Sequence, residues 1–187
     1  MIKKYRNWIL LLLIVLPYIA LIPAFFWYKK TLDDIKDSSF IIISKQEMML
    51  YHFNFKGELL QQSPVATGKK FGNKTSVGDL KTPEGVFYIG EIRDASTWTH
   101  DFKDDSLGEI KGAYGAYFIS LNVPNQKGIG IHGTHDPKSI GTRASEGCIR
   151  MPNEELGKLV KHLKSATVVV ITPAQTDIDS TIAKSKK

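Results

Sequence analysis

The sequence is poor in cysteine, which occurs once in 187 residues, at position 148. One cysteine cannot close an internal disulfide, so a disulfide-stapled framework is excluded and the cellular compartment cannot be read from disulfides. A leftover thiol in an exported domain instead indicates reactivity. The His-Glu-x-x-His pattern of zinc proteases is also missing, and no internal repeat is apparent.

Most of the chain has almost no net charge. The formal net charge is +6, but five of the 25 Lys and Arg lie in residues 1–30, which contain none of the 19 Asp and Glu. The rest of the chain has 20 basic and 19 acidic residues, a net charge of +1. A near-neutral domain gives no support for a basic nucleic-acid patch, so we expect no nucleic-acid partner.

Charge is also absent from the 21 residues 8–28. As a helix this run would be about 31 Å long, close to the hydrocarbon thickness of a bilayer. Trp8, Trp27 and Tyr28 would place amphipathic aromatic rings at its ends. The run therefore predicts a single transmembrane anchor.

Basic residues on both sides of the run favour one orientation. Residues 1–7 contain three Lys or Arg and no acidic residue, so we expect them in the cytoplasm and the rest of the chain outside the membrane. The alternative is a cleaved signal peptide, with residues 22–24 as the cleavage site. Residues 29–37 are expected to be a short polar linker.

Short apolar runs with turn residues between them fill the remaining chain. The strand-like runs are 38–43, 48–53, 59–67, 85–92, 114–121, 128–131 and 167–172. Gly57 is expected in a hairpin turn, and the last run is expected to close the sheet. This pattern predicts a mostly-β domain over residues 38–172, built as a sandwich or barrel with one or two short helices.

One soluble helix is predicted over residues 152–165. Asn153 is placed to cap it, acidic residues occupy its first turn, and apolar side chains share one face. Residues 173–187 have no core pattern and are expected to form a flexible tail.

Residues 93–112 are too long and polar for a hairpin turn. Long segments of this kind often cover functional sites. We expect either a loop over a groove, with Trp98 or Tyr114 as a wall, or a surface insertion without a role.

The most informative segment runs from Ile131 to Met151, I-H-G-T-H-D-P-K-S-I-G-T-R-A-S-E-G-C-I-R-M. His132 precedes Cys148 by sixteen residues. Cysteine attacks as the thiolate, and a nearby imidazole can take its proton. Gly147 allows a sharp turn and leaves its N–H to face a developing oxyanion. The segment therefore predicts a cysteine nucleophile with its base.

The same segment resembles a known family signature. His-Gly-Thr followed by Ser-x-Gly-Cys-Ile-Arg-Met resembles the catalytic motif of the L,D-transpeptidases, the YkuD-type domain of bacterial cell-wall enzymes. Thr-Pro-Glu-Gly-Val-Phe at 82–87 and Tyr-Gly-Ala-Tyr-Phe-Ile-Ser-Leu at 114–121 support the resemblance, which covers roughly residues 38–172.

The resemblance implies a role for each motif residue. Cys148 would be the nucleophile and His132 the general base and acid. The backbone N–H groups of Gly147 and Cys148 would bind the oxyanion, and Ser145 and Gly133 would support the site. Substrate-binding roles are implied for Arg150, Tyr114 and Thr134. No metal and no cofactor are implied.

Two neighbours of the motif leave alternatives open. His135 could form a zinc site with His132 and Cys148, but only these three ligands are present. For His135 itself, a position on the loop surface is favoured over a role in orienting His132 or in binding substrate. Glu146 stands where many relatives have His. A carboxylate there would raise the thiol pKa unless it points to solvent or pairs with a cation such as Arg143 or Arg150.

The function implied by the resemblance is acyl transfer on peptidoglycan stem peptides. The enzyme would attack the diamino-acid carbonyl of a tetrapeptide stem, release D-alanine and pass the acyl group to an amine of another stem. The alternatives are a same-site L,D-carboxypeptidase or amidase, which passes the acyl group to water, and a non-catalytic wall-binding protein. The expected location is the outer side of the cytoplasmic membrane.

Overall fold

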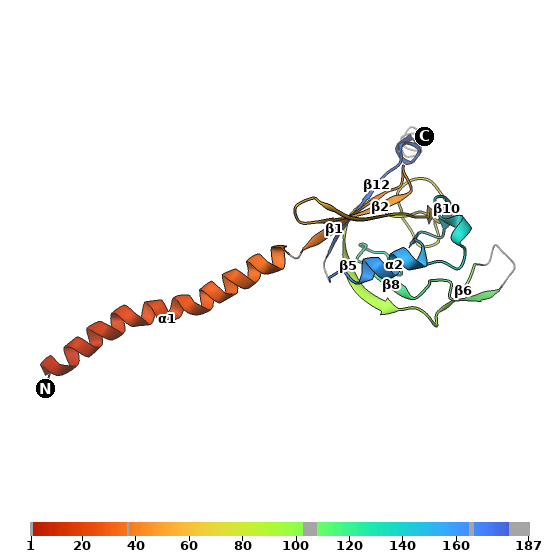
Figure 1. The fold of residues 1–187 in the computed structure, drawn as a ribbon. Helices are drawn as coiled ribbons and strands as arrows, with labels where there is room; N and C mark the ends of the chain where they lie inside the picture. The colour runs from red at the N-terminus through yellow and green to blue at the C-terminus, as the bar shows by residue number, and fades with distance from the viewer. Residues whose placement is uncertain (1, 37, 103–107, 165–166, 180–187) are drawn as a thin grey trace. The chain divides into compact units, whose positions relative to one another are not determined.

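The computed structural model describes residues 2–36, 38–102, 108–164 and 167–179. The chain divides into two compact units, Met1–Ser38 and Ser39–Lys187 (Figure 1).

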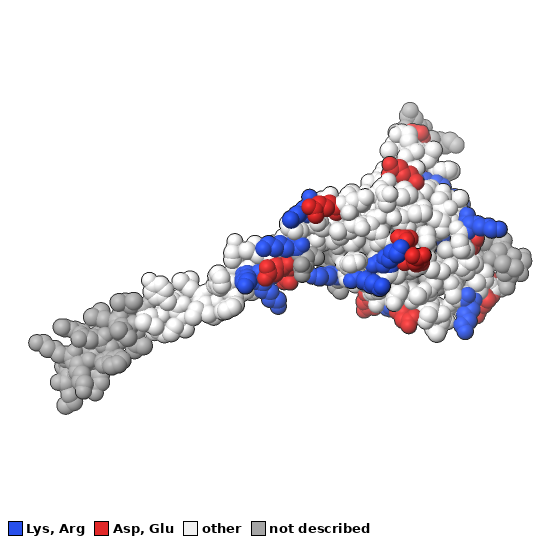
Figure 2. All heavy atoms as spheres, in the orientation of Figure 1, with Lys and Arg blue, Asp and Glu red and all other residues white. Residues whose placement is uncertain are grey.

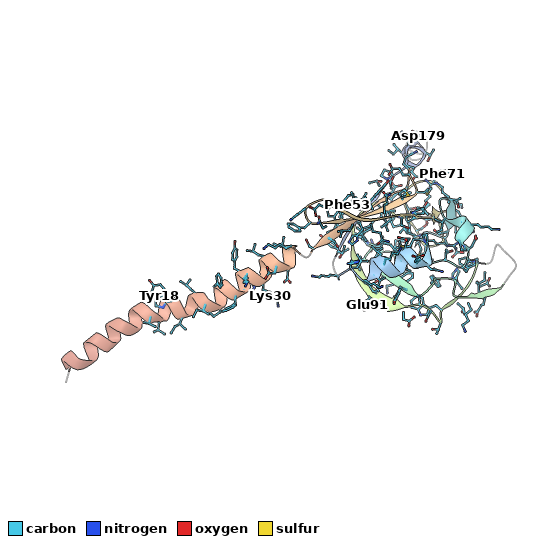
Figure 3. The ribbon with its side chains drawn as sticks, viewed as in Figure 1. Tyr18, Lys30, Phe53, Phe71, Glu91 and Asp179 are labelled. Atoms are coloured by element: carbon cyan, nitrogen blue, oxygen red, sulfur yellow. The ribbon has the colours of Figure 1, made fainter. Side chains whose placement is uncertain are left out.

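The first unit is one helix, α1 (Ile2–Lys36), with Pro17 and Pro23 inside it. Side chains such as Tyr18 and Lys30 project from it (Figure 3). The helix includes the apolar run 8–28 and continues to Lys36, through nearly all of the expected linker. Within the described ranges, no helix combines the length and hydropathy that a membrane crossing requires, so the structure does not support the predicted span.

The second unit is mostly β, as predicted. Its sheets contain β1 (Ser39–Ser44), β2 (Met49–Asn54), β3 (Leu59–Pro64), β4 (Thr67–Gly68), β5 (Gly85–Asp94), β6 (Thr99–Asp101), β7 (Glu109–Lys111), β8 (Tyr117–Leu121), β9 (Gly130–His132), β10 (Arg143–Ser145), β11 (Ile149–Arg150) and β12 (Val168–Thr172). Eight of them form one sheet in the order β11-β9-β8-β5-β12-β1-β2-β3; β4 pairs with β10 and β6 with β7.

The eight-stranded sheet curls until its two ends meet. Arg150 in the end strand β11 exchanges two backbone hydrogen bonds with Ala66, two residues after β3, at 2.8 and 2.9 Å. This single bridge makes the sheet barrel-like without a continuous ladder around it. The run expected to close the sheet, now β12, instead lies inside it, parallel to β1 and antiparallel to β5.

The core fills one face of the curled sheet. Alternate strand residues are buried there, as the twofold periodicity of a strand requires. The side chains drawn in Figure 3 crowd between the strands and α2 (Asn153–Val160). Helix α2 contributes Leu156 and Leu159 to this core, both fully buried.

The predicted helix is shorter than expected and starts differently. Pro152 occupies the N-cap position without a side-chain bond, and α2 ends at Val160. Asn153 therefore does not cap the helix; its side chain contacts Thr134 instead. Because Pro152 has no side-chain donor or acceptor, the helix begins without a capping bond.

The tail prediction is wrong for residues 173–179. Residues 175–179 are helical, and the Asp177 side chain is fully buried. It pairs with Lys45 at 2.9 Å and with Arg143 at 3.0 Å, and it accepts a hydrogen bond from the Gly72 N–H at 2.6 Å. A buried ion pair, which an apolar pattern cannot reveal, fixes this segment. The remaining tail, residues 180–187, lies outside the described residues.

Acidic and basic side chains are interspersed over the face of the second unit that Figure 2 shows. This agrees with the near-neutral charge of the chain beyond residue 30.

Candidate active site

An open cavity of about 330 Å³ lies where the nucleophile loop, β9 and the β6–β7 hairpin come together. The residues that line it include most of the predicted site, and His132, Cys148, Ser145, Arg150 and Tyr114 are all among them. Four parts of the sequence supply the walls, which are 74–80, 100–102 with 114, 126–132 and 145–150.

Cys148 ends the loop between β10 and β11. Its Sγ donates a hydrogen bond to the Gly128 O at 3.3 Å. Burial raises the pKa of the Cys148 thiol to about 11, although a backbone hydrogen bond from Gly130 and the charges of Arg150 and Lys74 lower it. The resting group is therefore a thiol.

Gly147 has a conformation that only glycine adopts without strain. Its φ is +138°, and a Cβ there would lie 2.8 Å from the Lys81 O and 3.3 Å from the Lys74 Nζ. The turn it makes presents Cys148 to the cavity.

Ser145 ties this loop together. Its hydroxyl donates to the Cys148 O and accepts from the Gly147 N–H at 3.1 Å. The Gly147 N–H, expected to bind an oxyanion, thus already has an acceptor in this state. An oxyanion would have to compete with the Ser145 hydroxyl for it.

His132 is the last residue of β9, which pairs in parallel with β11 so that His132 lies opposite Arg150. The preceding residue pair, Ile131 and Ile149, is fully buried, so the strand is anchored in the core. This register places the residue before Ile149, Cys148, beside the strand that carries the imidazole. The predicted base and nucleophile thus face one cavity, His132 at the end of β9 and Cys148 directly before β11.

The geometry of His132 fixes its tautomer. Its Nδ1 lies 2.7 Å from the Gly133 O, and because a carbonyl only accepts, Nδ1 carries the proton and Nε2 is a free base. The ring stacks on Phe118 and packs edge-on against Tyr114. Burial lowers the pKa of His132 to about 3, so the imidazole is neutral at rest.

The turn after His132 is held by Asn153. Its amide accepts from the Thr134 N–H at 2.8 Å and donates to the Thr134 O at 3.0 Å. A Cβ at Gly133 would collide with the same amide, which explains the glycine. Asn153 is a site-positioning residue that sequence reasoning assigned to helix capping.

Thr134 contributes to this turn and not to the cavity wall. Its hydroxyl donates to the Asp136 O at 3.1 Å and accepts from the Asp136 N–H at 3.0 Å. Among the described residues that line the cavity, Thr134 and Gly133 are not included. The structure thus gives both residues a part in the turn behind the base.

Arg150 brings a positive charge to the cavity. It is 5% exposed, and its guanidinium lies 4.7 Å from the centre of the Phe102 ring. Its buried Nε has no partner among the described atoms. An arginine in this state can still donate to a ligand carboxylate.

Glu146 pairs with neither arginine proposed for it. Its carboxylate lies 3.0 Å from the Nε2 of His100 in β6, and the Nδ1 of the same ring lies 3.0 Å from the Tyr114 hydroxyl. Arg143 instead pairs with Asp177. The hairpin residue His100 could not be found from local sequence because it lies 46 residues from its partner.

The 93–112 segment reaches the cavity. Its residues His100 and Phe102 line the cavity, as Tyr114 does. Trp98 packs behind Tyr114 with ring centres 5.7 Å apart. The segment is therefore a wall of the site, while residues 103–107 lie outside the described part.

Lys74 is a second cation that sequence reasoning missed. Its Nζ lies 2.8 Å from Asp79, which also accepts hydrogen bonds from the N–H groups of Thr75, Ser76 and Lys81. Burial pushes the pKa of Asp79 up, but these bonds outweigh it and hold the pKa well below its usual range. Asp79 thus folds the loop that carries Lys74 to the cavity.

In the described ranges, no three His, Cys, Asp and Glu side chains converge as metal ligands. His135 does not point to a shared site with His132 and Cys148; its ring stacks on Phe102 with centres 5.1 Å apart.

Comparison with known families places the site within a matched domain. The L,D-transpeptidase catalytic domain family, YkuD, matches residues 38–171, which include the whole cavity. YkuD of Bacillus licheniformis, named as an L,D-transpeptidase, is 45% identical over 118 residues, 63% of this chain and 56% of that protein. The chain spans about half the length of the curated relatives it matches.

Solved structures show the same fold at low sequence identity. The catalytic domain of an E. faecium L,D-transpeptidase superposes with a TM-score of 0.53 at 20% identity, covering 72% of this chain and 97% of that one. The LD transpeptidase LdtMt1 in complex with imipenem superposes with a TM-score of 0.53 at 16% identity, covering 72% and 59%.

Proposed function

Since the chain belongs to the family of L,D-transpeptidase catalytic domains, YkuD, we propose that it is an acyltransferase acting on peptidoglycan stem peptides. The observation that carries the proposal is one cavity, inside the matched region, lined by a thiol and an imidazole with a free Nε2.

In the first half-reaction, Cys148 attacks the diamino-acid carbonyl of a tetrapeptide stem. The Nε2 of His132 takes the thiol proton as the S–C bond forms, which suits a pair that is neutral at rest. The C–N bond to the terminal D-alanine then breaks, and His132 returns the proton to the leaving amine. The product is a thioester between the stem and Cys148.

In the second half-reaction, an amine of another stem attacks the thioester. A C–N bond forms, the C–S bond breaks, and the Cys148 sulfur recovers a proton. The result is a cross-link between two diamino acids. Cations at the cavity, Arg150 and Lys74, support the proposal because stem peptides carry carboxylates.

Incubation of the protein with disaccharide-tetrapeptide stems tests the proposal. We expect dimers and one released D-alanine for each cross-link, measured by mass spectrometry, and neither product with Cys148→Ala. Shortened stems without dimers would instead favour the same-site hydrolase. If neither the unsubstituted protein nor Cys148→Ala turned over the stems, the wall-binding protein would be favoured.

The proposed substrate lies outside the cytoplasm. The uncharged run 8–28 and its basic flank support an export or anchoring segment, and we propose the outer side of the cytoplasmic membrane as the location. Fractionation of cells that produce the full chain tests this: recovery in the cytosolic fraction would contradict it.

A further inference from the structure

A second chain of acid–base groups lines the same cavity as His132. The Glu146 carboxylate, the His100 imidazole and the Tyr114 hydroxyl form two consecutive hydrogen bonds of 3.0 Å each. The carboxylate can only accept, so His100 Nε2 carries a proton and His100 Nδ1 accepts from the Tyr114 O–H. This is the order carboxylate, imidazole, hydroxyl, in which an imidazole can take a proton from the hydroxyl.

The inner end of this chain faces the reacting groups. The Tyr114 ring packs 4.8 Å from the His132 ring, and Tyr114 and Cys148 line the same cavity. Burial raises the pKa of Tyr114 and the nearby Glu146 carboxylate raises it further, against the charge of Arg150, which lowers it, so the hydroxyl stays protonated at rest. It donates to His100 and keeps oxygen lone pairs for the cavity.

The outer end of the chain reaches solvent. The Glu146 side chain is 43% exposed and the His100 side chain 29% exposed, whereas His132 is 3% exposed. A proton that arrives on His100 can therefore leave to water, while a proton on His132 cannot leave easily.

The proposed reaction needs such an exit. An acceptor that enters as an ammonium loses two protons when it becomes an amide. One of these protons ends on the Cys148 sulfur, through His132. The other must leave the site, because the products are an amide, a thiol and one released proton.

We propose that Tyr114, His100 and Glu146 form a relay that removes the first proton from the acceptor ammonium. The Tyr114 oxygen takes a proton from the ammonium as its own proton passes to His100 Nδ1, and the imidazolium is stabilised by Glu146 before it releases the proton to solvent. Tyr114 touches the substrate, and His100 and Glu146 act through it. The inference rests on the proposed transpeptidase function, and it gives these three residues a part in proton transfer that the family signature does not imply.

The decisive variant is His100→Gln in the full chain. A glutamine side chain can donate to Glu146 and accept from Tyr114, so it keeps both hydrogen bonds, but it cannot take up a proton. In single-turnover experiments we expect the rate of transfer from the acyl-enzyme to a stem amine to fall about a hundredfold relative to the rate of acylation. Tyr114→Phe, which keeps the ring beside His132, is expected to show the same separation.

Two controls separate proton transfer from positioning. Hydroxylamine is already unprotonated at neutral pH, so it should cleave the acyl-enzyme of His100→Gln at the rate of the unsubstituted protein. Thr99→Ala alters the neighbouring residue, whose exposed hydroxyl contacts Glu109 outside the cavity, and should change neither half-reaction.

The outcomes are distinct. Transfer to the stem amine at full rate by His100→Gln, or an equal loss with hydroxylamine, would overturn the relay and leave the transpeptidase proposal standing. An unsubstituted protein that forms no acyl-enzyme would overturn the transpeptidase proposal itself, and the relay with it.

Discussion

The resting charges of Cys148 and His132 are set by burial, which shifts their pKa values in opposite directions. The thiol has a pKa of about 11 and the imidazole a pKa of about 3, so neither is charged at neutral pH. We expect the rate of Cys148 alkylation by iodoacetamide to rise about tenfold per pH unit above neutrality, because only the thiolate reacts. The rate is measured by intact mass over a pH series. A rate that is already constant near neutral pH would show a preformed thiolate–imidazolium pair.

Gly147 is the residue whose backbone most directly limits the site. In Gly147→Ala, a positive φ and a Cβ only 2.8 Å from the Lys81 O must both be accommodated. We expect a loss of about 1–3 kcal/mol in the free energy of unfolding and loss of acylation. Thermal melting and acyl-enzyme mass measure the two effects. Full acylation by the variant would contradict the role given to this turn.

At the scale of elements, the start of α2 holds the turn that follows His132, the proposed catalytic base. Asn153→Ala removes both hydrogen bonds to Thr134 and leaves the N–H and the O of Thr134 without those partners. We expect a loss of about 1–3 kcal/mol in stability and a slower acylation, since His132 is no longer braced. Stopped-flow acylation and denaturant titration are the measurements.

A change in the same helix provides the matched control. Gly157 lies in α2, and a Cβ there would meet nothing within 4 Å. Gly157→Ala should therefore stabilise the protein by about 0.5–1 kcal/mol and leave acylation unchanged. If both variants slowed acylation equally, α2 as a whole and not the Asn153 amide would position the base.

The elements differ in how far the sequence could predict them. The short apolar runs 38–43, 48–53 and 85–92 form strands β1, β2 and β5, close to where the sequence predicts them. The position of β12 inside the sheet could not be predicted, because a short apolar run carries no information about its neighbours.

The residues of the site also differ in how far the sequence could predict them. The motif places Cys148 and His132 in one cavity because both belong to one contiguous segment with a recognisable pattern. His100, Lys74 and Asn153 reach the site through tertiary contacts over long sequence separations. The residue type of Asn153 predicts a helix cap, but in the fold its amide makes two hydrogen bonds with the backbone of Thr134.

At the scale of the whole second unit, a buried ion network joins its two ends. Lys45 in the segment after β1 pairs with Asp177 near the C-terminus and with Glu84 at 2.6 Å. Asp177→Ala removes one partner of a fully buried ammonium, so we expect a loss of about 3–5 kcal/mol in the free energy of unfolding. Denaturant titration is the measurement, and a change below 1 kcal/mol would contradict this role.

The same carboxylate makes stability depend on pH. Burial pushes the pKa of Asp177 up, but hydrogen bonds from the Gly72 N–H and Lys45 outweigh it and lower the pKa to about 2. A lowered native pKa stabilises the fold above the unfolded value of about 4, and this contribution is lost as pH falls toward 2. The melting temperature should fall over this window, and Asp177→Asn should flatten that part of the curve.

The most direct test of the central claim is the intact mass of the full chain after incubation with a carbapenem, beside Cys148→Ala. Imipenem, a carbapenem, is bound in the LdtMt1 structure that shares this fold, and the strained β-lactam ring of such a compound can acylate a reactive thiol. We predict one covalent adduct on the unsubstituted protein and none on the variant. No adduct on either protein, or an adduct that persists without Cys148, would contradict the assignment of Cys148 as the nucleophile.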